Sequence, residues 1–162
     1  MGQKVNPTSM RLQVSKDWRS KWFAGKKEYT KFLTEDLEVR RLIDAKYGKR
    51  GAINQVDIER SPSLVTVTVK TAKPGVVIGR GGAGVEELKL DIIKVLKTEV
   101  RVRIEELKKP ELYAKLVGEN IANQLERRIA FRRAVKSAVA ATMRAGAKGI
   151  RVEVAGRLNG AE

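Results

Sequence analysis

Apolar residues recur every three or four positions between residues 28 and 47, and this spacing predicts an amphipathic helix. Residues 52–60 and 64–70 instead alternate between apolar and polar side chains, and the proline turn between them predicts a β-hairpin. A helical pattern returns over residues 85–97, and a third alternating segment follows over residues 100–105. The pattern therefore predicts a small, half-exposed sheet with helices packed on it.

A glycine-rich segment precedes the second helix. Val76-Val77-Ile78 is a short strand-like run that stops at Gly79-Arg80-Gly81-Gly82, and the helical pattern begins directly afterwards. A Gly-x-x-Gly loop lets backbone N–H groups approach phosphates, the positive end of the next helix favours the same anion, and Arg80 adds a cation. Because KH domains clamp a nucleic-acid backbone with such a loop, the candidate RNA-binding residues are Gly79, Arg80, Gly81 and Gly82.

The same glycines fit a second pattern. Gly79, Gly81 and Gly84 spell G-x-G-x-x-G, and Glu105 follows about 20 residues later, as dinucleotide-binding folds require. The strands of such folds are covered on both faces and read as near-continuous apolar runs. Residues 100–105 alternate instead and have one charged face, so the sequence favours a nucleic-acid clamp over a cofactor site. A glycine turn without a ligand is a third interpretation.

A short turn of helix before the loop makes the element order over residues 28–107 resemble the αββααβ order of type II KH domains. Lys108-Lys109-Pro110 predicts a domain boundary, because proline opens helices readily at their first turn. Residues 108–162 then predict one helix, a second helix over about residues 126–145, and a strand over residues 150–154. The predicted fold class is α+β: a type II KH domain followed by a small α/β domain with two helices packed on a sheet.

The second of these C-terminal helices carries a basic face. At about 100° per residue, its apolar residues fall on one side and its cations within about half a turn on another. The cations are Arg128, Arg132, Arg133, Lys136 and Arg144. No acidic residues are interleaved with them, so their mutual repulsion favours a phosphate partner over a merely solvated helix surface, which is the alternative.

Composition narrows the class of function. A net charge of +15 over 162 residues indicates a polyanionic partner, most simply nucleic acid, with a membrane surface as the competing interpretation. Cysteine and histidine are absent, which excludes thiol chemistry, disulfides, Cys/His zinc sites and histidine acid–base catalysis. No apolar stretch approaches transmembrane length, and the N-terminus lacks the features of a signal peptide. We expect no enzyme activity, cofactor, metal, small-molecule substrate or membrane association.

The charge is concentrated at the two ends of the chain. Residues 1–27 hold seven Lys and Arg against one Asp, and residues 107–162 hold twelve against five acids. Residues 1–27 show no sustained period and predict a basic arm that orders on a partner. Trp18, Trp22 and Phe23 either anchor this arm or cap the neighbouring core, and the second interpretation is slightly favoured. The candidate nucleic-acid-binding residues of the arm are Lys4, Arg11, Lys16, Arg19 and Lys21.

Several blocks of the chain resemble a known family. These blocks are similar to bacterial-type small-subunit ribosomal protein three, the KH-containing family of the subunit's head, and they occur in the family's order across essentially the whole chain. They comprise residues 1–7 with Arg11-Leu12, and residues 74–82, 124–134, 146–150 and 156–162.

The resemblance implies a structural protein that binds small-subunit rRNA in the head through its arm and KH loop. It also implies neighbouring ribosomal proteins as partners and a place lining the channel by which mRNA enters. Arg132, Arg133 and Lys136 fall where the family places basic residues that face incoming mRNA and help to unwind it, a step that needs no nucleotide hydrolysis by this chain. The implied location is the cytoplasmic ribosome, with an organellar ribosome left open.

Two departures from the family pattern affect these expectations. Ser9 and Gln13 stand where many relatives have glycine, which can change the turns of the arm. The family normally continues beyond Glu162 with further strands, so we expect the C-terminal domain, residues 108–162, to be incomplete. A single strand cannot form a sheet alone.

Two other functions remain as alternatives. A free KH-type RNA-binding regulator or ribosome assembly factor shares the loop but does not stay stoichiometric with ribosomes. A nucleotide-dependent enzyme using Gly79, Gly81 and Gly84 is disfavoured by the absence of His and Cys, by the small length and by the alternating strands.

Overall fold

A computed structural model describes residues 2–158 and shows two compact units, Met1–Glu106 and Leu107–Glu162. The division falls one residue before the boundary expected from the sequence. Within the described residues, no helix combines the length and the apolarity needed to cross a bilayer.

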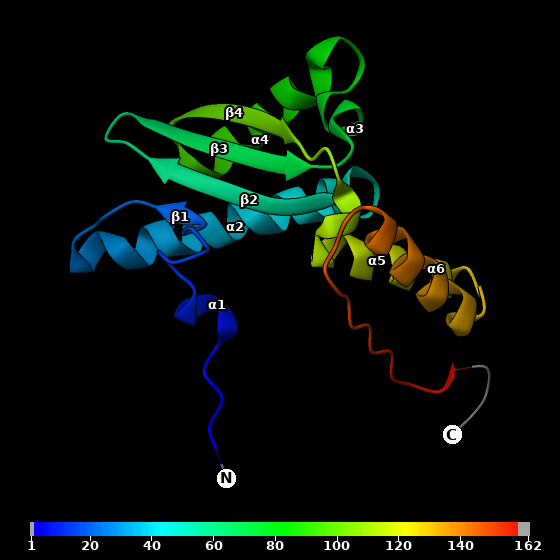
Figure 1. Cartoon of the computed structure of the whole chain (residues 1–162). Helices are drawn as coiled ribbons and strands as arrows, with labels where there is room; N and C mark the ends of the chain where they lie inside the picture. The colour runs from blue at the N-terminus through cyan, green and yellow to red at the C-terminus, as the bar shows by residue number, and fades with distance from the viewer. Residues whose placement is uncertain (1, 159–162) are drawn as a thin grey trace. The chain divides into compact units, whose positions relative to one another are not determined.

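The first unit has the predicted type II KH order (Figure 1). The helix predicted over residues 28–47 is longer at both ends. The strands predicted over residues 52–60, 64–70 and 100–105 and the helix after the glycine loop form within two residues of their expected bounds. The elements are α1 (Pro7–Met10), β1 (Ser20–Lys21), α2 (Lys26–Gly51), β2 (Ile53–Arg60), β3 (Leu64–Thr71), α3 (Pro74–Ile78), the 3₁₀ turn η1 (Arg80–Gly82), α4 (Ala83–Leu96) and β4 (Glu99–Glu106).

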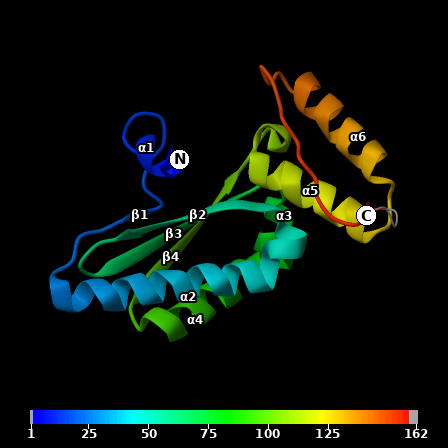
Figure 2. The same cartoon turned by 90° about the horizontal axis from the view of Figure 1, so that it is seen from below.

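The sheet has the order β1-β2-β3-β4, with β2 and β3 antiparallel and the two outer pairings parallel. Helices α2 and α4 lie across the same face, as Figure 2 shows from below. Strand β3 alternates along its length, so that Val65, Val67 and Val69 are buried beneath the helices. Helix α4 covers them with Leu88, Ile92 and Leu96, one residue per turn. Every second residue of β3 and every fourth residue of α4 is buried, and this regular spacing made both elements predictable from the sequence.

The strand-like interpretation of residues 76–78 is wrong, because these residues form the end of helix α3. Pro74 occupies the first turn of this helix, where the missing N–H is not needed. Val77 is fully buried, whereas Val76 and Ile78 are about two-fifths exposed. A helix turns only one of three consecutive residues inward, and the short turn of helix that a KH order requires before the loop is therefore present.

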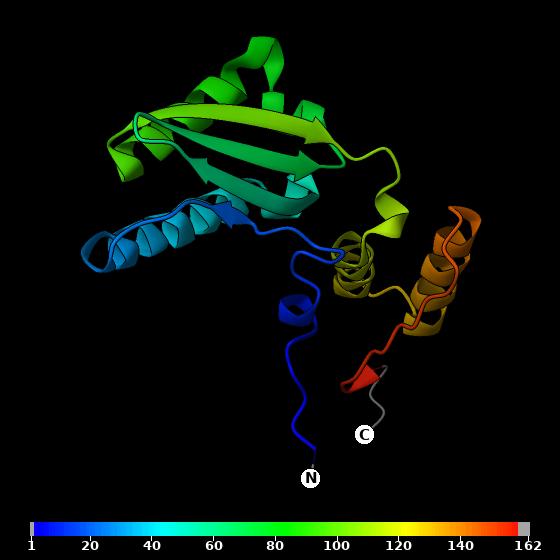
Figure 3. The same cartoon turned by 60° about the vertical axis from the view of Figure 1, so that its left-hand side comes forward.

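Part of the arm is folded onto its own domain, which corrects the expectation that the arm orders on a partner. Asn6 caps α1 by accepting the N–H of Thr8 at 2.8 Å. Strand β1 extends the sheet beyond β2, and the Ile58 N–H donates to the Arg19 carbonyl at 2.9 Å. Figure 3 shows β1 and β4 at opposite edges of the sheet. Residues 19–22 are thus held by pairing with β2 and by hydrogen bonds to side chains of α2.

A buried polar cluster fastens this segment to the core. Asp36 of α2 is fully buried and accepts hydrogen bonds from Ser20 Oγ, from Trp22 Nε1 and from both Nε and Nη2 of Arg60, at 2.6–3.0 Å. The Trp22 ring packs on Tyr29 and Phe32, with ring centroids 5.2 and 5.7 Å apart. Trp22 therefore caps the core, as expected, whereas Trp18 and Phe23 are exposed.

An ion-pair network joins α2 to α4. Lys46 Nζ lies 2.7 Å from Asp91 and 2.8 Å from Glu87, and Lys94 approaches Asp91 at 3.1 Å. Burial by itself lowers the pKa of Lys46, but its hydrogen bonds to Asp91 and Glu87 outweigh this effect and raise that pKa. The hydrogen bond from Lys46, followed by that from Lys94, lowers the pKa of Asp91.

This network predicts an acid-side dependence of stability. Because the pKa of Asp91 is lower in the folded state, its contribution is present above the unfolded pKa of about 4 and is lost as the pH falls through the folded value. Asp91→Asn is therefore expected to be less stable than the unaltered chain at pH 7, with the gap closing below about pH 4. Urea unfolding at several pH values measures this difference in unfolding free energy, and Glu106→Gln at an exposed position is the control. A difference that does not change with pH would contradict the prediction.

The second unit contains the turn η2 (Pro110–Leu112) and the helices α5 (Ala114–Glu126) and α6 (Phe131–Arg144). Leu116 and Ile121 of α5 are buried, as are Ala134, Ala138 and Thr142 of α6. The expected helix start near residue 126 is wrong, because a turn separates the helices. The strand expected over residues 150–154 also does not form: burial alternates there, but within residues 2–158 the segment pairs with no strand. The sheet expected beneath the helices is thus absent from the described part of this unit.

Candidate nucleic-acid interface

The glycine loop joins α3 to α4 through three left-handed residues. Gly79, Gly81 and Gly82 have φ values of +71°, +62° and +86°, a conformation that L side chains disfavour. No side chain caps the N-terminus of α4, and Gly79, Arg80 and Gly81 are exposed. The loop therefore presents bare backbone, a helix N-terminus and one cation at the surface, which is the arrangement that suits a phosphate group.

Gly84 has a different role from the loop glycines. A Cβ atom on Gly84 would lie 2.5 Å from the Val77 carbonyl oxygen, and one on Gly79 would lie 3.0 Å from the Gly84 nitrogen. These glycines allow α3 and α4 to approach each other closely, which accounts for the G-x-G-x-x-G spacing without a cofactor. The loop also follows a helix, whereas a dinucleotide fingerprint follows a strand. The structure thus contradicts the dinucleotide interpretation.

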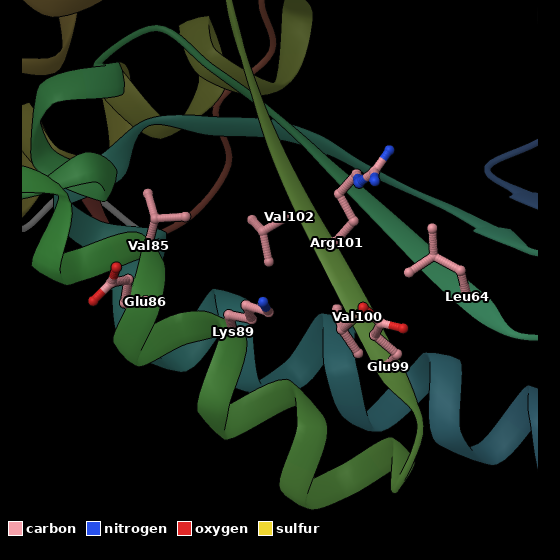
Figure 4. A pocket seen from close by; sticks show the side chains of 8 residues that line it. All are labelled: Leu64, Val85, Glu86, Lys89, Glu99, Val100, Arg101 and Val102. Carbon is pink, nitrogen blue, oxygen red and sulfur yellow. The ribbon is translucent and has the colours of Figure 1, made fainter.

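A groove runs from the first turn of α4 to the edge strand β4 (Figure 4). It is a shallow hollow of about 260 Å³, lined by both apolar and charged side chains. The lining residues are Leu64, Val85, Glu86, Lys89, Glu99, Val100, Arg101 and Val102. A partly apolar hollow that begins in the helix turn after the glycine loop can accept an unstacked base. Sequence reasoning missed this groove, because the order of the strands decides which one borders α4.

The basic face of α6 holds four of its five predicted cations. Arg132, Arg133, Lys136 and Arg144 are exposed on the side opposite the buried residues. Arg128 is not on this face: it lies in the turn between α5 and α6 with φ +61°, so its helical position was wrongly predicted. Helix α6 contains no acidic residue, and within the described residues no ion pair involves Arg132, Arg133 or Lys136.

The predicted cations of the arm differ in their contacts with the rest of the fold. Lys21 lies 3.6 Å from Glu59 and 3.9 Å from Asp17, and the Arg11 guanidinium donates to the Pro7 carbonyl at 2.9 Å. Lys4, Lys16 and Arg19 are exposed. In the described part of the chain, no three His, Cys, Asp or Glu side chains are grouped to hold a metal ion.

Comparisons with known proteins give a consistent result. Residues 38–112 match the KH domain model, and residues 121–162 match the model of the ribosomal protein S3 C-terminal domain. All 162 residues align with curated proteins named small ribosomal subunit protein uS3. Identities are 52% for Ligilactobacillus salivarius, 52% for Hydrogenovibrio crunogenus and 50% for Coxiella burnetii, and the chain covers 73%, 71% and 71% of these relatives.

Proposed function

Because the chain belongs to the family of small ribosomal subunit protein uS3 and is thus a structural component of the small ribosomal subunit, we propose that it binds small-subunit rRNA in the head and lines the channel by which mRNA enters. In this role it contributes to mRNA binding and unwinding, contacts neighbouring ribosomal proteins and catalyses no reaction itself. The cytoplasmic ribosome is its proposed location.

The observation that carries the mRNA role is the acid-free basic face of α6. Four exposed cations share this helix with no carboxylate, and packing on the other side holds them in place through Ala134 and Ala138. Cations without counter-charges repel one another, and a passing phosphate backbone relieves that repulsion. Because these contacts go to phosphates, they hold a strand without reading its sequence. Such a face suits mRNA of any sequence.

The rRNA role is supported by the loop and the arm. Gly81 and Gly82 directly precede α4, whose N-terminus has no side-chain cap, and the arm adds cations to a folded edge of the sheet. Phosphate contacts of this kind fix the position of a protein on RNA. Under this proposal the loop with its groove and the arm hold the protein in the particle, and α6 handles the message.

Charge reversal separates these roles. We expect Arg132→Glu with Arg133→Glu to leave incorporation into small subunits intact while slowing initiation on structured messages several-fold. If each arginine binds one phosphate, loss of both makes the salt dependence of single-stranded RNA binding shallower by about 1.4 in log–log slope. Arg41→Glu with Arg50→Glu on α2 gives the same charge change elsewhere and serves as control. Initiation at the normal rate on structured messages would count against the mRNA role.

Sedimentation tests the alternative of a free regulator or assembly factor. We expect one copy per small subunit at low salt and at high salt, because a loosely held basic protein is stripped by salt. Release from the particle at high salt, with recovery in free RNA or at the top of the gradient, would instead support the alternative.

A further inference from the structure

Two exposed aromatic rings flank the part of the arm that is fixed to the sheet. Phe23 is 96% exposed and Trp18 is 53% exposed, whereas Trp22 between them packs inward. We propose that Trp18 and Phe23 are stacking sites for unpaired bases of the small-subunit rRNA. This inference rests on the proposed rRNA binding and identifies the kind of nucleotide that the arm recognises.

The rings are presented by an ordered backbone. The Arg19 carbonyl accepts hydrogen bonds from the Ile58 N–H at 2.9 Å and from the Arg40 guanidinium at 3.2 Å. Ser20 and Trp22 are both tied to the buried carboxylate of Asp36. Residues 19–22 are therefore held on both sides of the strand, and Trp18 and Phe23 directly adjoin them. Folding has therefore already ordered the backbone beside the two rings, so RNA binding loses less conformational entropy there.

Within residues 2–158, these two rings have no aromatic partner. Five of the eight aromatic residues of the chain lie between positions 18 and 32. The Trp22 ring contacts Tyr29 at a tilt and Phe32 edge-on, but within the described residues neither Trp18 nor Phe23 contacts another ring. A phenylalanine left almost wholly in water loses the stabilisation that burial of a large apolar side chain provides. A contact with a base would restore that stabilisation.

The charge around the rings selects RNA as that contact. Lys16, Arg19, Lys26 and Lys27 surround the two aromatic positions in sequence, and the single acid of the region, Asp17, lies 3.9 Å from Lys21. Unpaired RNA offers a base face for each ring and phosphates for the cations at once, which is how proteins recognise single-stranded loops and bulges. A protein surface that docks here must instead be both apolar and acidic.

Leucine substitutions distinguish stacking from apolar docking, because leucine keeps most of the apolar area but has no π-face. The full chain carrying Trp18→Leu, Phe23→Leu or both is titrated with an rRNA fragment of the small-subunit head at fixed salt. We expect each single change to weaken binding about five- to tenfold, with the salt dependence unchanged because no phosphate contact is lost. Tyr113→Leu, at an exposed aromatic of the second unit, is the control and should leave the affinity unchanged. Thermal unfolding checks that every variant is folded.

The outcomes separate the possible partners. An rRNA affinity that survives both leucine changes overturns the inference. The inference also fails if affinity survives while Trp18→Ala and Phe23→Ala reduce association with neighbouring ribosomal proteins, because the rings then dock on protein. If the unaltered chain does not bind the rRNA fragment at all, the proposed rRNA function fails and this inference with it.

Discussion

Replacing Asp36 by alanine is expected to lower the free energy of unfolding of the N-terminal unit by about 3–5 kcal/mol, because one partner of a buried ion pair is removed. Arg60 has only 7% of its side chain exposed and donates to both Asp36 and Glu35. Without Asp36, its guanidinium keeps the Glu35 contact at 2.7 Å but loses two hydrogen bonds. The Trp22 indole N–H also loses its acceptor inside the fold.

The loss should extend to the arm, since Asp36 links β1 to α2. Ser20 and Trp22 lose their shared acceptor, so β1 is then held by its pairing with β2, by the Arg40 guanidinium and by the Lys21–Glu59 ion pair. We therefore expect the tryptophan emission of the folded Asp36→Ala variant to shift towards longer wavelength. Cleavage of the arm by trypsin should also be faster.

Urea unfolding followed by tryptophan emission measures the effect. Glu38→Ala changes an exposed carboxylate on the same helix and should stay within about 0.5 kcal/mol of the unaltered chain. Asp36→Asn keeps an acceptor oxygen but no charge and should fall between the two. A loss below about 1 kcal/mol for Asp36→Ala would show that the cluster is no stronger than a single ordinary hydrogen bond.

The sequence could predict the elements of the KH unit because each has a clean period. Val65, Val67 and Val69 alternate in a strand with one covered face, and Leu88, Ile92 and Leu96 mark one side of a helix. Local pattern does not reveal partners distant in the chain. Asp36 is an ordinary polar residue of an amphipathic helix in the sequence, and it is buried only because donors from residues 20, 22 and 60 converge on it.

The errors have similar physical causes. Three apolar residues at positions 76–78 are too few to distinguish a period of two from one of 3.6. No glycine or proline marks the end of α5, so nothing in the sequence signalled that Arg128 would take a left-handed turn conformation. The segment over residues 150–154 has a strand's alternation but no partner strand within the described residues, and a strand forms only by pairing. The loop was predictable, since positive φ values demand glycine, but the groove beside it depends on sheet order.

Replacing Gly84 by alanine should disturb the glycine loop indirectly, by forcing apart the two helices that the loop joins. The added Cβ would lie 2.5 Å from the Val77 carbonyl oxygen and 3.0 Å from that of Ile78, and both are backbone atoms of α3. Neither can rotate away, so α3 and α4 must separate. We expect a loss of about 1–3 kcal/mol in unfolding free energy, as for other overpacked sites. The Gly84 carbonyl also accepts the Tyr47 hydroxyl at 3.2 Å, so movement of this turn disturbs its contact with α2.

The same movement displaces the loop that the RNA contacts are proposed to use, so the Gly84→Ala variant should bind rRNA more weakly even at temperatures where it remains folded.

Gly118→Ala is the control for the substitution itself. A Cβ on Gly118 of α5 meets no atom within 4 Å, and removing a helix glycine there should stabilise its unit by about 0.5–1 kcal/mol. Gly82→Ala adds backbone strain at φ +86° without a clash, so it perturbs the loop while leaving the two helices in contact. Weaker RNA binding in both loop-region variants, with separation of the helices only in Gly84→Ala, would assign the recognition to the loop. Unfolding of Gly84→Ala at the same urea concentration as the unaltered chain would contradict the close packing of α3 on α4.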